Sequence, residues 1–194
     1  MKAELLAQIV GAFQPDKGTH IEKLDKADPT YRQARTIEAA FTGGVEVLRS
    51  AFPNERIRAL GSVIWDIFHH RYVSMALGPA VPTLSIGIFG RPDALQALVF
   101  APHNWAEMTA KNPLMELGAI VLVGSQAVDF YNGRVLTDGS GVMMHRARSY
   151  EAEYIRSLGS AVKLTDYQQE LLREFPHGFD TRLDYKRKPV APMN

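Results

Sequence analysis

The longest regular pattern of apolar and polar positions covers residues 54–77. When successive residues are placed about 100° apart, one side of this segment carries an apolar stripe, formed by Ile57, Leu60, Gly61, Ile64, Ile67, Phe68 and Met75. Asn54 is a favourable N-cap residue, and Gly78-Pro79 cannot continue a helix. The pattern therefore predicts one long helix over residues 54–77, with the stripe facing the core.

Helical spacing also predicts further helices at residues 2–13, 31–51 and 143–158, and a last helix that begins at Thr165. In the first of these, the apolar residues expected to face inward are Leu5, Leu6, Ile9, Val10 and Phe13. Gly43-Gly44 interrupts the second pattern and predicts a kink, a break or a close helix crossing. Thr165 and Gln168 have the spacing of a capping box.

The segments that follow residue 77 are different in character. Residues 82–90 are rich in β-branched and alternating positions, and residues 94–102 are a candidate return strand, although Pro92 at a first helical position would equally start a short helix. Residues 114–131 fit a helix that is apolar almost all round, and they fit strands whose second half turns at Asn132-Gly133 equally well.

Together these patterns predict an α+β fold with a single globular domain over residues 1–180. Helices dominate it around the central segment 54–77, and a small antiparallel sheet is drawn from residues 82–137. The alternative is an all-α fold. Residues 181–194 are basic and contain proline, and we expect them to form a tail.

Composition and charge limit the kinds of partner and binding site that we expect. The 22 basic and 21 acidic residues give a net charge of +1, which offers no electrostatic reason to expect nucleic acid as a partner. The absence of cysteine excludes disulfides, thiolate metal sites and a cysteine-ligated iron–sulfur cluster in this chain. No run of about 18 uninterrupted apolar residues is present, so we expect a cytoplasmic protein that does not cross a membrane.

The strongest candidate site lies on the polar side of segment 54–77. Asp66, His69 and His70 are one helical turn apart, and a carboxylate beside an imidazole can share a metal ion or transfer a proton. His103 and Glu107 have the same spacing and are additional ligand candidates. The competing interpretation is that Asp66, His69 and His70 form a solvated face with a local i,i+4 ion pair, and that His103 belongs to a turn. Arg71 projects from the apolar stripe, so we expect it either to have a carboxylate or carbonyl partner, which the sequence does not identify, or to extend its guanidinium outward to solvent.

Motifs for specific reactions are lacking. The stretch Thr137 to Gly141 has no lysine and no spacing of a phosphate-binding loop, and no Gly-x-Ser-x-Gly is present. The sequence therefore assigns no reaction and no resident cofactor.

The order of features over about residues 50–100 resembles part of the ferric siderophore reductase family. Ala59, Leu60, Ser62, Tyr72, Gly78 and Pro79 carry this likeness, in a helix that runs to an aromatic residue and prolines and is followed by strands. The resemblance implies a pocket for an iron chelate or another small ligand. The family's iron–sulfur cluster is ligated by cysteines, which this chain lacks.

Two functional hypotheses follow. The first is a protein that binds a small ligand or a metal chelate, related to siderophores or iron, through Asp66, His69, His70 and His103. The second is a non-catalytic interaction or structural protein that acts as a homo-oligomer, which the large apolar content favours.

Overall fold

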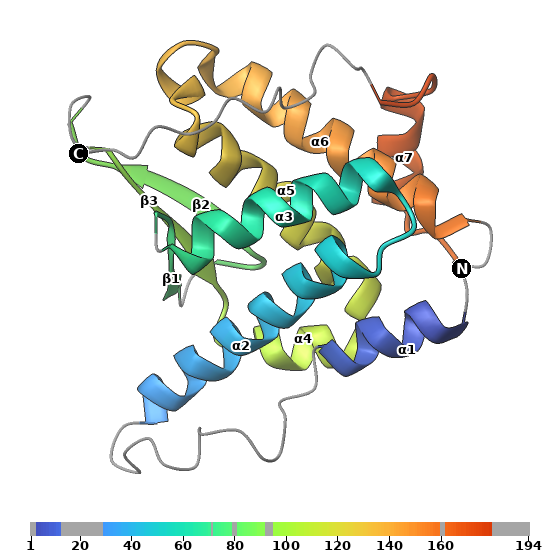
Figure 1. Ribbon diagram of the computed structural model, residues 1–194, viewed down its shortest axis with the longest axis horizontal. Coiled ribbons are helices and arrows are strands. Elements are labelled where there is room, and N and C mark those ends of the chain that lie inside the picture. Colours follow the sequence, from blue (N-terminus) through green and yellow to red (C-terminus); the bar gives the residue numbers. More distant parts are fainter. Residues whose placement is uncertain are drawn as a thin grey trace.

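Helix α3 (Glu55–His69) lies at the centre of the protein and packs against α2 (Pro29–Ser50) on one side and α5 (Pro113–Tyr131) on another (Figure 1). The computed structural model describes residues 3–12, 29–70, 72–78, 81–91, 95–159 and 162–179. The side chain of Asn54 caps α3, because its Oδ1 accepts a hydrogen bond from the backbone N–H of Ile57 at 3.2 Å. The predicted start of the central helix is thus confirmed.

The buried face of α3 is the predicted apolar stripe. Its fully buried residues are Ile57, Leu60, Gly61, Ile64 and Ile67. Gly61 is at the crossing with α2, where a Cβ atom would lie only 2.7 Å from the backbone nitrogen of Arg49. Glycine therefore allows the two helix backbones to approach closely at this point.

The central helix ends earlier than predicted. α3 stops at His69, and residues 74–77 form strand β1 (Ser74–Leu77), which pairs in parallel with β3 (Gln96–Ala101). Met75 therefore belongs to the sheet. The helical prediction for residues 74–77 is wrong because pairing with a strand distant in sequence supplies the backbone hydrogen bonds that a helix would otherwise provide.

The three-stranded sheet has the order β1-β3-β2 and lies at one end of the molecule (Figure 1). The predicted antiparallel pair is present, since β2 (Ser85–Phe89) pairs with β3 in register Ser85 to Phe100 through Phe89 to Gln96. The sheet is mixed, however, and its strands lie within residues 74–101. None of the described residues 102–137 contributes a strand.

Helix α5 resolves the ambiguous segment. It is unbroken over Pro113–Tyr131, begins with proline in its first turn and is buried on several sides by α3, α6 (Gly139–Leu158) and neighbouring elements. By length and composition α5 would suffice to cross a membrane, yet most of it is buried inside the protein. Its apolar character is accounted for by its place in the core.

The remaining helices surround this centre. They are α1 (Ala3–Ala12), α4 (Trp105–Lys111), the 3-10 helix η2 (Arg134–Leu136) and α7 (Asp166–Glu174). Leu5 and Ile9 of α1 are buried as expected, whereas Leu6 and Val10 are exposed. α2 continues through Gly43-Gly44 without a break.

The predicted fold class, a helix-dominated α+β domain, is confirmed, and the all-α alternative is not. The capping box of Thr165 and Gln168 is also present at the start of α7. The basic tail, residues 181–194, lies outside the described residues, and so does Arg71.

Candidate functional site

The residues predicted as the main site, Asp66, His69 and His70, all lie at the exposed C-terminal end of α3. Over the described part of the chain, no side-chain ion pair joins Asp66 to either histidine. Instead the two imidazoles contact each other edge to face, with their ring centroids 5.4 Å apart. Of the three residues, His69 lines the cleft described below, and Asp66 and His70 are not part of its wall.

This cleft has a volume of about 660 Å³ and lies between α2, the end of α3 and the start of β1. Its size falls in the range of pockets that hold small organic ligands. We call it the α2–α3 cleft. Its walls are formed by Ala34, Arg35, Glu38, Phe41, Thr42, Val45, Trp65, Phe68, His69, Val73, Ser74 and Met75.

Aromatic side chains form much of the apolar wall. Phe41 of α2 and Phe68 of α3 contact each other with ring centroids 4.7 Å apart, and Phe41 also lies 6.4 Å from Trp105. Phe41 and Val45 are four residues apart, as helical spacing requires for two residues on the same face of α2. The crossing of the two helices therefore brings together apolar rings from segments distant in sequence.

Trp65 is the most distinctive aromatic residue of the cleft. The guanidinium of Arg49 lies 4.3 Å from the centre of its ring, and the imidazole of His69 stacks nearly parallel to it at 5.7 Å with an interplanar angle of 13°. Both contacts use the π surface of the indole. Two side chains of the protein, one cationic and one planar, thus lie against this ring.

Polar groups gather on the α2 side of the cleft. The Arg35 guanidinium donates to Glu38 at 2.5 Å, and both side chains are roughly half exposed. The Thr42 hydroxyl donates to the carbonyl oxygen of Glu38 at 2.8 Å. The cleft thus combines an apolar wall with a cation, a carboxylate and an imidazole, which suits a ligand that has an apolar body and a polar end.

The sequence did not identify Arg35, Glu38 or Trp65 as site residues. The i,i+3 spacing of Arg35 and Glu38 was visible, but such pairs are common on solvated helix faces. Trp65 lies one turn from His69 on the same helix, whereas only the crossing of α2 with α3, which is a tertiary feature, places Arg35 and Glu38 beside His69.

His103 and Glu107 are placed apart from this cleft, because neither of them lines it. His103 precedes α4 in a turn, where its Nδ1 lies 3.2 Å from Gln33 Oε1 and its carbonyl oxygen accepts from Gln33 Nε2 at 2.5 Å. Glu107 is exposed in the first turn of α4. Within the described ranges, no group of three or more His, Asp or Glu residues is arranged to hold a metal ion.

A row of surface rings leads away from the cleft. The ring centroids of His70 and Tyr72 are 6.1 Å apart, and those of Tyr72 and Tyr131, at the end of α5, are 4.9 Å apart. Partial burial, followed by the neighbouring Tyr72 hydroxyl and the charge of Asp66, raises the pKa of Tyr131. Asp66 thus faces the tyrosines and lies outside the cleft wall.

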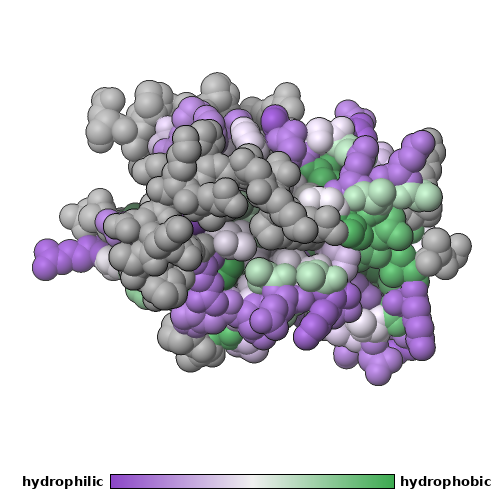
Figure 2. Space-filling model, turned by 90° about the horizontal axis from the view of Figure 1, so that it is seen from below, coloured by the Kyte–Doolittle hydropathy of each residue, from purple (hydrophilic) through white to green (hydrophobic). Residues whose placement is uncertain are grey.

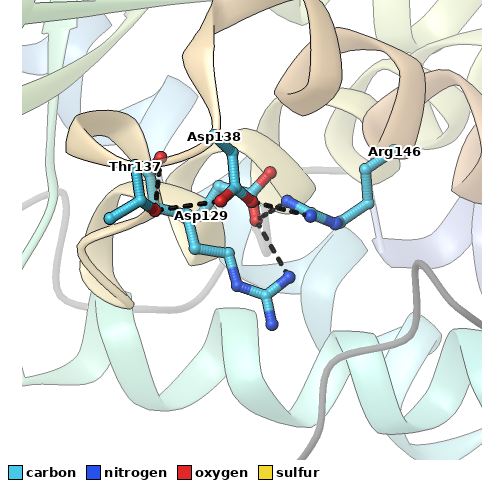
Figure 3. Close-up of polar contacts among 5 residues, drawn as sticks. Asp129, Thr137, Asp138 and Arg146 are labelled. Atoms are coloured by element: carbon cyan, nitrogen blue, oxygen red, sulfur yellow. Dashed lines mark hydrogen bonds and ion pairs between the residues drawn. The ribbon is translucent and has the colours of Figure 1, made fainter.

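A second cluster of charges is buried between α5 and α6 (Figure 3). Arg146 donates to Asp129 at 2.6 Å and to Asp138 at 2.9 Å, and Asp129 is fully buried. Burial raises the pKa of Asp129, against the opposing effect of Arg146, while the hydrogen bond from Arg146 lowers the pKa of Asp138. Arg146 therefore links the end of α5 to the start of α6 through its bonds to Asp129 and Asp138, which is a structural role.

No family model matches this chain, and no curated protein or solved structure is significantly similar to it. The α2–α3 cleft is consequently assessed on its own geometry.

Proposed function

We propose that this protein binds a small organic ligand or a metal chelate in the α2–α3 cleft. The observation that carries the proposal is a cavity of about 660 Å³ in which Phe41, Trp65 and Phe68 adjoin polar groups of α2 and His69. An apolar or planar ligand body would lie against the rings, and a polar substituent would reach Arg35, Glu38 or His69.

The chelate version of this proposal draws on the resemblance to the ferric siderophore reductase family. The segment over which the resemblance extends, residues 50–100, contains six residues of the cleft wall, namely Trp65, Phe68, His69, Val73, Ser74 and Met75, although the described residues among those that carry the likeness do not line the cleft. A chelate brings its own donor atoms, so its recognition depends on shape, stacking and charge rather than on a set of protein ligands.

Binding can be measured through Trp65, because the chain has only two tryptophans and the other, Trp105, is fully buried. We would titrate the protein with a ferric hydroxamate, a ferric catecholate, the same chelators without metal, and aromatic carboxylates. At least one probe is expected to give a saturable change in tryptophan fluorescence, with the stoichiometry checked by calorimetry.

Two matched variants decide whether the cleft is the site. The hydroxyls of Thr42 and Ser50 both donate to the carbonyl four residues earlier on α2, at 2.8 and 2.6 Å, but only Thr42 lines the cleft. Thr42→Phe should fill the cleft and weaken binding roughly tenfold or more, whereas Ser50→Phe should leave it unchanged. Equal binding by both variants, or no binding of any probe to the unmodified protein, would reject the proposal.

The probes also separate the two versions of the ligand. Tighter binding of the ferric complexes than of their metal-free chelators would support the chelate version. Equal binding would assign recognition to the organic frame.

We also propose, as a second candidate function, self-association through α1. Leu6 and Val10 of this helix are 40% and 37% exposed, and Met115 at the start of α5 is 48% exposed. Figure 2 shows apolar surface gathered at the end of the molecule where α1 lies. Exposed apolar surface of this kind is typical of a face that pairs with another protein surface, here a second copy of the chain.

Light scattering over a range of protein concentrations tests self-association. A dimer is expected, and Leu6→Gln should shift it toward monomer. The control is Leu136→Gln, which alters a leucine that is 62% exposed on η2, away from α1, and should not change the molar mass. A strict monomer at all concentrations would reject this second candidate.

A further inference from the structure

The interface between α6 and α7 contains a carboxylate that is enclosed by protein and is the partner of a tyrosine hydroxyl. Glu151 of α6 is only 7% exposed, and the Tyr167 hydroxyl of α7 donates to its Oε2 at 2.6 Å. On the opposite side lies α5, where a Cβ atom at Gly118 would be 3.9 Å from Glu151 Oε1. α7 therefore covers Glu151 and supplies its hydrogen-bond donor.

Charge compensation for this carboxylate is weak. Among the described residues, Arg148 is the cation whose charge lowers the pKa of Glu151, but its guanidinium is bound to Glu174 of α7 at 2.6 Å. Tyr154 of α6 also faces Glu151, and its hydroxyl donates to the Leu114 carbonyl. An ionised Glu151 would thus be buried with one neutral hydroxyl as its direct partner, which is unfavourable.

α7 is a short helix that is held by few groups. Within it and just after it, the buried side chains are Gln168, Leu171 and Phe175. We propose that α7 is a proton-sensitive latch, docked on α6 while Glu151 is protonated and released more readily once Glu151 is ionised.

The direction of the pH dependence follows from the thermodynamic linkage between protonation of Glu151 and docking of α7. Burial, the largest influence, raises the pKa of Glu151 to about 7 from 4.5, against the opposing effects of Tyr167 and Arg148. When α7 leaves, solvent reaches Glu151 and its pKa falls toward the ordinary value. Docking is therefore strongest below pH 4.5 and weakens as the pH rises to about 7, and the constant for release should increase about tenfold between pH 6 and pH 8.

Hydrogen exchange of the full-length protein measures the equilibrium constant for release of α7. Exchange of the α7 amides, corrected for the intrinsic effect of pH, should show about a tenfold rise in opening between pH 6 and pH 8, while the amides of α3 report global unfolding. In Glu151→Gln the rise should fall below about twofold, because the titrating group is gone. An opening constant for α7 no larger than that for α3, which would mean that α7 is released only by global unfolding, or an unchanged rise in Glu151→Gln, would overturn the proposal.

Two further variants test whether Glu151 is the group that titrates. His145 is another titratable residue at this interface, since its Nδ1 lies 3.9 Å from Glu174 Oε1, and His145→Gln should retain the rise. Tyr167→Phe removes the donor that lowers the pKa of Glu151, so the midpoint of release should move to higher pH. Two results would show that Glu151 is not the group that senses pH. One is loss of the pH-dependent rise in the α7 opening constant in His145→Gln. The other is an unchanged midpoint of that rise in Tyr167→Phe.

Discussion

Replacement of Arg146 by methionine is expected to lower the free energy of unfolding by about 3 to 5 kcal/mol, since it leaves Asp129 buried without its cation. Asp129 is fully buried, and Arg146, itself 5% exposed, is its hydrogen-bond donor at 2.6 Å. The remaining cation, Arg134, lies 3.9 Å from the same carboxylate oxygen. Urea denaturation at pH 7, followed by circular dichroism, would measure the loss.

A control on the same helix separates burial from charge. Arg148 also forms an ion pair, with Glu174 at 2.6 Å, but both of its members are about one-third exposed. Arg148→Met should therefore cost less than about 1 kcal/mol. If Arg146→Met is as mild as Arg148→Met, the network between α5 and α6 does not hold the two helices together.

Removal of the buried negative charge of Asp129 should restore part of the stability that Arg146→Met loses. Asp129→Asn in the Arg146→Met background eliminates the buried anion and is expected to recover more than half of the loss. The single variant should also depend on pH. Loss of Arg146 raises the pKa of Asp129 further, so Arg146→Met should be least stable at neutral pH and less impaired in acid, where Asp129 is protonated.

The features that could be predicted from the sequence are those decided by neighbouring residues. Asn54 caps α3, and Thr165 with Gln168 caps α7, because both motifs need only the chain within one turn. The stripe of α3 was predictable for the same reason, as its spacing alone defines the face that is buried.

Features that depend on distant segments could not be predicted. Residues 74–77 have no glycine or proline to end the helix before them, and only pairing with residues 98–101 makes them a strand. α5 is apolar almost all round because other elements cover it on several sides, and for such a segment periodicity does not distinguish helix from strand.

The candidate site shows the same division. His69 was predicted from its position on the polar side of the segment, and it does line the cleft, whereas Asp66 and His70 do not. Arg35, Glu38 and Thr42 are more than 20 residues away along the chain. They join the site through the packing of α2 against α3, which approach each other closely where Gly61 faces Leu48 and Arg49.

Truncation of Ile64 to alanine should lower the free energy of unfolding by about 2 to 5 kcal/mol through the cavity that it leaves. Ile64 is fully buried, and its side chain occupies the space over Gly124 of α5, where a Cβ atom would overlap it. His70, on the opposite side of α3, is exposed, and His70→Ala should cost less than about 1 kcal/mol. Equal losses in the two variants would mean that the polar face of α3 is buried.

A double-mutant cycle tests the contact itself. Gly124→Ala alone should destabilise the protein, because its new methyl group collides with Ile64 despite the better helix propensity of alanine. In the double variant Ile64→Ala with Gly124→Ala, the methyl group enters the space that Ile64 vacates. The combined loss should therefore be clearly smaller than the sum of the two single losses, whereas additive losses would show that Ile64 and Gly124 do not set the distance between α3 and α5.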